Sequence, residues 1–340
     1  MTAADLGLLL LPDQPLDELA GMAIEAEQLG YQTVWVADEK FYRDPWVTLS
    51  VLASATRRVR LGTGVTEPYA RHPALIASAA ATLAELCGDR LVIGLGAGGS
   101  GFPPMGVQRR RPISALPEAV EIIRGLLAGR QVDVAGQVLS FRGGSLSFPA
   151  RPLPIYIAAR GRRMLATAAA TADGVIAAPF ASPAAVQRAL VEIRRGAEGA
   201  ATRPRVALRV DVCLGETREN AEEAVRPFVA LPLWVSYPDW SYAEGLGIQL
   251  PDGLRALMAR RDYRDIADAG PLLPREMVDH FAVAGTEDDI SHRLGELAGV
   301  ADELIVHPVA SPSAGREDVI QSVARIFHEL RSKAGAGGGE

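Results

Sequence analysis

The feature that most constrains this chain is a regular alternation of short apolar segments with amphipathic helical segments along its whole length. A chain that alternates β-branched, apolar strands with helices usually builds a parallel sheet from βα units. Eight such strands are predicted, and they begin near residues 6, 33, 59, 90, 154, 174, 205 and 303. Eight βα units predict an α/β protein with a closed (β/α)8 or TIM barrel that carries insertions.

The helices between these strands have recognisable starts and ends. Between the first two strands, Leu16, Leu19 and Ala23 recur at helical spacing, and Gly30 stands where a helix commonly ends. Similar spacing predicts helices near residues 48, 75, 118, 184 and 318. Thr286, followed by three carboxylates, predicts another helix start, because a hydroxyl caps free amides and acids favour the positive end of the helix.

The chain has 340 residues, 48% of them hydrophobic, which is enough for one large barrel domain. We assign that domain to residues 1–332, with insertions at about 97–112, 130–150 and 230–275. The second insertion resembles a β-hairpin. The third is irregular and aromatic, which is typical of a lid or substrate pocket, although its aromatic residues equally fit packing or a dimer contact. The Gly-rich residues 333–340 predict a disordered tail.

Composition narrows the function classes. The 35 Lys and Arg residues against 41 Asp and Glu give a net charge of −6, so a nucleic-acid partner is not expected. Cys87 and Cys213 lie far apart and outside any metal-ligand spacing, which predicts no metal site, no disulfide and a reducing cytoplasmic setting. The first apolar segment is too short to span a membrane. We expect a homodimer that acts on a small molecule.

In a TIM barrel, the active site forms at the C-terminal ends of the strands. The second predicted strand is followed by Asp38 and Glu39, and the third by the run Gly64–Thr66. After the fourth strand, the run Gly94–Gly99 would let a planar or phosphorylated ligand approach the backbone closely, because glycine has no Cβ. These strand ends are therefore the candidate site.

After the fifth strand, Gly161 opens a helix and is flanked by Arg160, Arg162 and Arg163. Helix N-terminal amides combined with guanidinium groups form phosphate sites, and a solvated basic helix start is the alternative interpretation. This position predicts a phosphate site.

Several other chemistries are disfavoured. The sequence has no GxSxG elbow, no HExxH helix and no P-loop ending after the glycine run, which argues against hydrolase and NTPase functions. His72 and His307 lie near strand ends, but a structural role is favoured for both. The scarcity of acid and base groups suggests that a bound cofactor supplies the chemistry.

A resemblance to a known family is carried by the segments DPWVTLSVLAS, VRLGTGVTEPYARHPALIASAAATLAEL, DRLVIGLGAGGSG, PIYIAARGRRML and ADGVI. In this order and spacing they resemble the luciferase-like superfamily of flavin-dependent and deazaflavin-dependent oxidoreductases. They are most similar to its branch of methylenetetrahydromethanopterin reductases and related enzymes, which use coenzyme F420. The resemblance covers residues 1 to about 230 well and the last strand and helix more loosely.

The resemblance implies hydride transfer between F420, bound in the barrel mouth, and a small organic substrate. Asp38 would lie beside the coenzyme ring, and Gly64 and Val65, followed by Thr66, would form a non-prolyl cis peptide behind it. The tail would run past Ala97, Gly98 and Gly99 to a phosphate site at Gly161, Arg162 and Arg163. The arginines at 109–111 and 160–163 could meet a polyanionic tail.

One departure concerns Glu39, because many deazaflavin enzymes of this family carry histidine at that position. Glu39 either faces the substrate, where burial would make it a proton donor, or turns outward to pair with Arg43. An FMN-dependent monooxygenase that uses molecular oxygen is the alternative function. A third reading is a phosphate-sugar isomerase or lyase on the same barrel, with Asp38 and Glu39 as acid and base.

Overall fold

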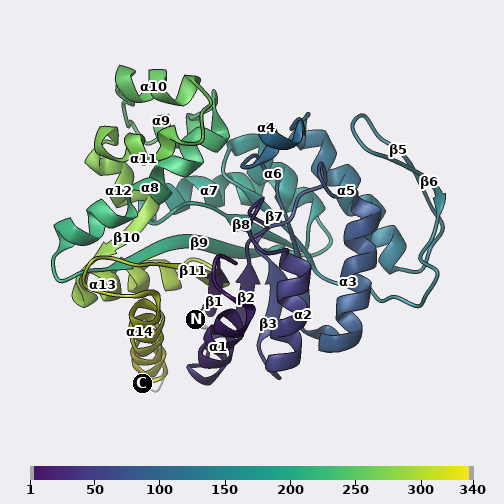
Figure 1. Cartoon of the computed structure of the whole chain (residues 1–340), viewed down its shortest axis with the longest axis horizontal. Coiled ribbons are helices and arrows are strands. Elements are labelled where there is room, and N and C mark those ends of the chain that lie inside the picture. Colours follow the sequence, from purple (N-terminus) through teal and green to yellow (C-terminus); the bar gives the residue numbers. More distant parts are fainter. Residues whose placement is uncertain (1–3, 337–340) are drawn as a thin grey trace.

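The computed structural model describes residues 4–336 and contains a closed barrel of eight parallel strands (Figure 1). The strands are β1 (Asp5–Leu10), β2 (Thr33–Val36), β3 (Arg60–Thr63), β4 (Leu91–Leu95), β7 (Ile155–Ala159), β8 (Gly174–Ala177), β9 (Arg205–Leu214) and β11 (Glu303–Val309). The ring closes because β9 pairs with β8 on one side and with β11 on the other. All eight predicted strands are confirmed.

Helices follow the strands and surround the barrel. They are α1 (Leu16–Gln28), α2 (Pro45–Ala55), α3 (Pro73–Cys87), η1 (Gly88–Arg90), α4 (Phe102–Met105), α5 (Pro112–Leu127), α6 (Arg162–Thr171), α7 (Pro183–Gly196), α13 (Glu287–Ala298) and α14 (Arg316–Ala336). Gly30 follows α1 with a φ of 87°, and Thr286 forms a capping box with Asp289 at the start of α13. Both predicted helix boundaries are therefore confirmed.

The predicted disordered tail is wrong for residues 333–336, because α14 continues to Ala336. Its last turns are attached to a 21-residue helix whose earlier residues pack on the barrel, and that packing extends the helix beyond the point where the sequence becomes Gly-rich. Residues 337–340 of the predicted tail lie outside the described residues.

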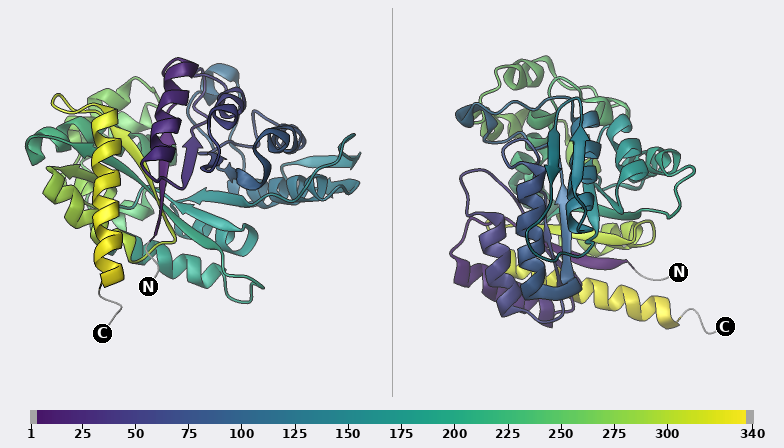
Figure 2. Two further views of the ribbon diagram at one scale, coloured as in Figure 1. Left: turned by 90° about the horizontal axis from the view of Figure 1, so that it is seen from below. Right: turned by 90° about the vertical axis from the view of Figure 1, so that its right-hand side faces the viewer.

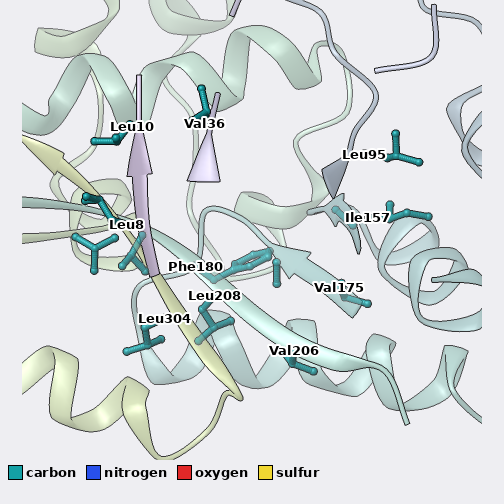
Figure 3. Close-up of a cluster of buried hydrophobic side chains, with 14 of the residues drawn as sticks. Leu8, Leu10, Val36, Leu95, Ile157, Val175, Phe180, Val206, Leu208 and Leu304 are labelled. Carbon is teal, nitrogen blue, oxygen red and sulfur yellow. The ribbon is translucent and has the colours of Figure 1, made fainter. Parts of the chain in front are cut away.

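The strands bury both of their faces, because successive side chains point to opposite sides. Side chains such as Leu8, Val36 and Leu208 face outward and pack under the helices (Figure 3). A second cluster fills the barrel interior, and we call it the inner cluster: Leu9, Trp35, Val92, Tyr156, Ile176, Ala207 and Ile305. Ala37, Val65 and Ala158 are only partly buried and pack against it at strand ends. These three residues form the floor of the barrel mouth.

The 130–150 insertion forms the predicted hairpin, β5 (Val132–Ala135) and β6 (Ser140–Gly144). The hairpin extends away from the barrel at the right edge of Figure 1, and the left view of Figure 2 shows the same projection. It contributes no strand to the barrel.

The segment before the last strand is helical, so the prediction that residues 230–275 are irregular is wrong. It consists of α8 (Arg218–Ser236), α9 (Ser241–Glu244), α10 (Asp252–Ala259), α11 (Asp265–Ala269), η2 (Gly270–Leu272) and α12 (Arg275–Phe281). Pro227 and Pro232 lie inside α8 and obscure its periodicity in the sequence. Trp234, Trp240 and Tyr242 are buried, which favours packing as the role of these aromatic residues. An unpredicted short strand, β10 (Ala282–Gly285), pairs with the last four residues of β9.

Candidate active site

Asp38 and Lys40 follow β2 and lie against the chain that follows β3. The Lys40 ammonium is 2.9 Å from a carboxylate oxygen of Asp38 and 3.0 Å from one of Glu67. Thr66 donates a hydrogen bond of 2.6 Å to the other oxygen of Asp38. Burial alone would lower the pKa of Lys40, but the two carboxylates raise it above its usual value. In this group, which we call the carboxylate cluster, two carboxylates therefore share one ammonium.

Glu67 also fixes the loop after β3, because its carboxylate accepts hydrogen bonds from the amides of Tyr69 and Ala70. The sequence analysis found Asp38 and Thr66 but missed Lys40 and Glu67. Lys40 is two positions after Asp38, and Glu67 directly follows Thr66. A basic and an acidic residue next to two strand ends were therefore the sequence signal that could have revealed this ion pair.

The peptide bond between Gly64 and Val65 is cis, as predicted. The strand end containing it packs very closely on β4. A Cβ on Gly94 would lie 2.1 Å from the carbonyl oxygen of Thr63, and one on Gly96 would lie 2.5 Å from Cγ2 of Val65. Close strand packing therefore explains why positions 94 and 96 are glycine. The predicted contact with a ligand then concerns only Gly98 and Gly99.

Those glycines form the loop after β4, where Ala97 precedes Gly98 and Gly99. Gly98 has a φ of 58° and Gly99 a φ of 145°, conformations that side chains disfavour. A Cβ on Gly99 would come within 3.4 Å of Val235 on α8 and 3.6 Å of Arg109. The loop therefore runs from the carboxylate cluster toward α8 and an arginine.

Glu39 does not pair with Arg43, whose guanidinium instead donates to the carbonyl of Pro12. Burial raises the pKa of Glu39, while a hydrogen bond from Ser100 and the charge of Lys40 oppose that rise. The outward alternative for Glu39 is therefore wrong. The carboxyl lies between the loops that follow β2 and β4, where it can hold a proton at a higher pH than an exposed glutamate.

Three arginines near the mouth have no carboxylate within 4.0 Å among residues 4–336: Arg109, Arg160 and Arg261. We call them the mouth arginines. Arg160 donates to the carbonyl of Pro232 at 3.0 Å and to the hydroxyl of Ser236 at 3.2 Å. Arg261 lies 4.0 Å above the ring of Trp234. Arg109 donates to the carbonyl of Gly98.

Burial lowers the pKa of all three mouth arginines, and the charges of Arg109 and Arg209 lower that of Arg160 further. Guanidinium groups stay protonated in proteins. Positive charges that are held close together, removed from water and without a protein counterion indicate a site for an anion.

The predicted phosphate site after β7 has a different arrangement from the one expected. Gly161 precedes α6 and stands at its N-terminus, as predicted. Arg162, however, contacts Glu192 on α7 at 2.6 Å, and its side chain is 65% exposed. Arg163 is exposed. The engaged guanidinium of Arg162 makes Arg160 the better placed of the two for an anion in the mouth.

A third group lies at the ends of β9 and β11. Asp211 is fully buried and accepts hydrogen bonds of 2.6 and 3.0 Å from the guanidinium of Arg209. Its Oδ1 is also 2.7 Å from Nδ1 of His307. Burial alone would raise the pKa of Asp211, but Arg209 and His307 hold it below its usual value. Burial lowers the pKa of His307, although the hydrogen bond and the negative charge of Asp211 oppose this decrease.

Two further observations apply to the described part of the chain. Between residues 4 and 336, no group of three His, Cys, Asp or Glu side chains is placed to hold a metal ion. In the same range, every helix is too short or too polar to cross a lipid bilayer.

Comparisons with known proteins show the family of this chain. The luciferase-like monooxygenase family model matches residues 1–303. A 5,10-methylenetetrahydromethanopterin reductase of Methanolobus tindarius is 32% identical over 305 residues, which are 88% of this chain and 92% of that protein. The corresponding reductase of Archaeoglobus fulgidus is 33% identical over 316 residues, covering 89% and 93%.

Among solved structures, the coenzyme F420-dependent tetrahydromethanopterin reductase of Methanopyrus kandleri superposes with a TM-score of 0.80. It is 27% identical, and the match covers 95% of this chain and 98% of that one. Fold and site together define a TIM-barrel oxidoreductase whose mouth is built for a bound coenzyme. This chain belongs to the luciferase-like monooxygenase family, which confirms the predicted resemblance.

Proposed function

We propose that this protein transfers a hydride between coenzyme F420 and a small organic substrate at the mouth of the barrel. The observation that carries the proposal is the set of mouth arginines, which have no counterion among the described residues. F420 has a flat ring and an anionic tail, so it needs an apolar floor and a positive region beside it. Val65 with Ala37 and Ala158 provides the floor. The family relatives that are named as F420-dependent enzymes support the same coenzyme.

When bound, the deazaflavin supplies the two-electron hydride chemistry that no side chain can perform. The protein holds it. Asp38 and Thr66 would border the ring, while Ala97, Gly98 and Gly99 would let the tail pass close to the backbone. The tail phosphate would lie near the N-terminus of α6 at Gly161, with Arg160 and Arg163 as cations. Arg162 is held by Glu192 through its Nε, so it is the less favoured partner for the phosphate.

Glu39 is proposed as the proton-exchanging group on this side of the mouth. Its raised pKa would keep part of the population protonated closer to neutral pH than an ordinary glutamate allows. The neighbouring Lys40 is committed to Asp38 and Glu67, so it does not serve as the proton source.

A parallel titration with oxidised F420 and with FMN tests the proposed coenzyme. The ring fluorescence of each is followed as protein is added. Saturable binding of F420, weakening as salt is raised, is expected because guanidinium groups meet an anionic tail. Tighter binding of FMN would support the alternative, an FMN-dependent monooxygenase, and saturation by neither would contradict both.

We also propose that the protein works in the cytoplasm as a homodimer. Three exposed apolar side chains on neighbouring helices support a dimer contact: Val47 on α2, and Leu75 and Leu86 on α3. Light scattering of the purified protein measures the mass directly, and a monomer at micromolar concentration would contradict the dimer.

A further inference from the structure

The group formed by Arg209, Asp211 and His307 has no part in the function proposed so far. It faces the inside of the barrel. Ala207 and Ile305 belong to the inner cluster, and side chains alternate along a strand. Arg209 and Asp211, two and four residues beyond Ala207, therefore point inward, as does His307, two residues beyond Ile305. The pairing of β9 with β11 places Asp211 directly beside His307.

This group lies across the mouth from the predicted coenzyme floor. In the ring of strands, β9 is opposite β3, because β4, β7 and β8 separate them on one side and β2, β1 and β11 on the other. Val65 lies two residues after the end of β3. A ligand that rests on Val65 consequently faces β9 and β11, which is the side where a second molecule, the substrate, must enter.

The hydrogen bonds fix which nitrogen of His307 carries its proton. Asp211 is bound by two guanidinium nitrogens of Arg209, so it is ionised and can only accept. Its contact of 2.7 Å with Nδ1 of His307 is therefore donated by the histidine, and the longer contact of 3.3 Å between Arg209 and the same nitrogen is then not a hydrogen bond, because a protonated Nδ1 cannot accept. In a neutral imidazole this leaves Nε2 with a lone pair, and Nε2 makes no hydrogen bond to any residue in 4–336.

The surroundings keep the imidazole in place. The ring of Phe228 on α8 packs edge-on against it at 5.2 Å. The charged groups that face His307 are Asp211 and Arg209 on β9, Arg316 at the start of α14, and Asp13 in the loop after β1. Arg316 is itself paired with Asp13 at 2.6 Å, so this second pair adds little net charge.

We infer that His307, oriented by Asp211, is a general base for a substrate that carries a hydroxyl group on the carbon that is oxidised. The inference rests on the proposed function and names the substrate class as an alcohol, with the corresponding carbonyl compound as product. The alcohol carbon loses a hydride to the oxidised deazaflavin, which gains two electrons. The O–H bond breaks as its proton passes to Nε2 of His307, and a C=O bond forms. Reduction of the carbonyl reverses each change.

The first test needs no turnover and no coenzyme. Nitrogen-15 NMR of the histidine side chains reports the tautomer of each ring, and the His307→Asn variant assigns the signal. We expect a neutral His307 at pH 7 with the proton on Nδ1. A ring protonated on Nε2 at pH 7, alone or on both nitrogens, would overturn the inference.

The second test measures oxidation of propan-2-ol, cyclohexanol and glucose by oxidised F420. His307→Asn should lower turnover about a hundredfold or more, which is the usual contribution of a general base, and should leave F420 affinity within twofold. The acidic limb of the pH profile should disappear with the histidine. Asp211→Asn should also lower turnover, and this variant tests the inference if His307→Asn does not fold.

His280 provides a matched control, because it is a partly buried histidine whose Nδ1 lies 2.6 Å from the hydroxyl of Ser182, between α7 and α12. His280→Asn should keep turnover within about twofold. Failure of the parent protein to bind F420 would contradict the proposed function itself. Binding of F420 without oxidation of any of these alcohols, or full activity in His307→Asn, would contradict only the inference about His307.

Discussion

The two sides of the barrel mouth differ in how their charges are compensated. After β2 and β3, the carboxylates of Asp38 and Glu67 share the ammonium of Lys40, and every member of the cluster has a partner in the protein. The mouth arginines have no carboxylate within 4.0 Å in the part of the chain that the structure describes. On the first side, each charged group has an opposite charge beside it before any ligand arrives, whereas the mouth arginines would gain one only when an anion binds. We propose that one side positions the coenzyme ring and the other attracts its tail.

The largest effect is expected from Lys40→Met, which removes the only cation from the carboxylate cluster. The side chains of Asp38 and Glu67 are 8% and 2% exposed, so two carboxylates would be left buried without a counterion. Breaking a buried ion pair in this way costs about 3 to 5 kcal/mol of the free energy of unfolding. Urea denaturation measures the loss.

Arg151→Met is the control for Lys40→Met, because Arg151 pairs with an exposed Asp89 and such surface pairs contribute about 1 kcal/mol or less. Equal losses in the free energy of unfolding would show that the ion pairs of the carboxylate cluster stabilise the protein no more than a surface ion pair does.

Glu39→Gln keeps the size of the side chain and removes its titrating proton. If Glu39 exchanges a proton during turnover, the variant should lose about a hundredfold in turnover, while its affinity for F420 stays unchanged. Steady-state rates combined with the fluorescence titration separate the two quantities. Turnover near that of the parent would make Glu39 structural and leave His307 as the proton-transferring residue.

Arg160→Gln should weaken F420 binding by about 10-fold to 100-fold, the usual range for a lost charge-assisted hydrogen bond in a buried site. Arg162→Gln is the matched comparison, since the two arginines are two positions apart but Arg162 is exposed and paired with Glu192. The titration should show a much smaller change for Arg162→Gln. A larger loss for Arg162 would restore it as the phosphate ligand and reverse the ranking proposed above.

The smallest expected effect is on the pH dependence of stability. The folded state raises the pKa of Glu39 above its ordinary value of 4.5, so the stability linked to its protonation is present below that pH and is lost as the pH rises through the folded pKa. Glu39→Gln should therefore unfold at a slightly higher urea concentration than the parent at pH 7, with the difference disappearing by pH 4.5. A difference of the same size at both pH values would contradict the raised pKa.

The sequence predicted the barrel because its strands bury both faces and appear as continuous apolar runs. It missed β10, which has four residues and directly follows α12 without a turn signal. The predicted site residues form four short runs, each shortly after the end of one strand (β2, β3, β4 or β7), where residues adjacent in sequence are also adjacent in space.

The groups that the sequence did not reveal join distant segments. Lys40, which follows β2, contacts Glu67, which follows the neighbouring strand β3, and His307 contacts Asp211 from 96 positions away. His307 was judged structural because nothing next to it in sequence indicates a buried carboxylate. Only the pairing of β9 with β11 brings the two together.

The central claim, that the two sides of the mouth divide the coenzyme between them, is tested most directly by a crystal structure of the complex with F420. We expect the ring against Val65, bordered by Asp38, and an anionic group of the tail within hydrogen-bonding distance of Arg160 or Arg109. A ring seated against Asp211 and His307, or a tail that leaves the mouth without meeting these arginines, would contradict the account.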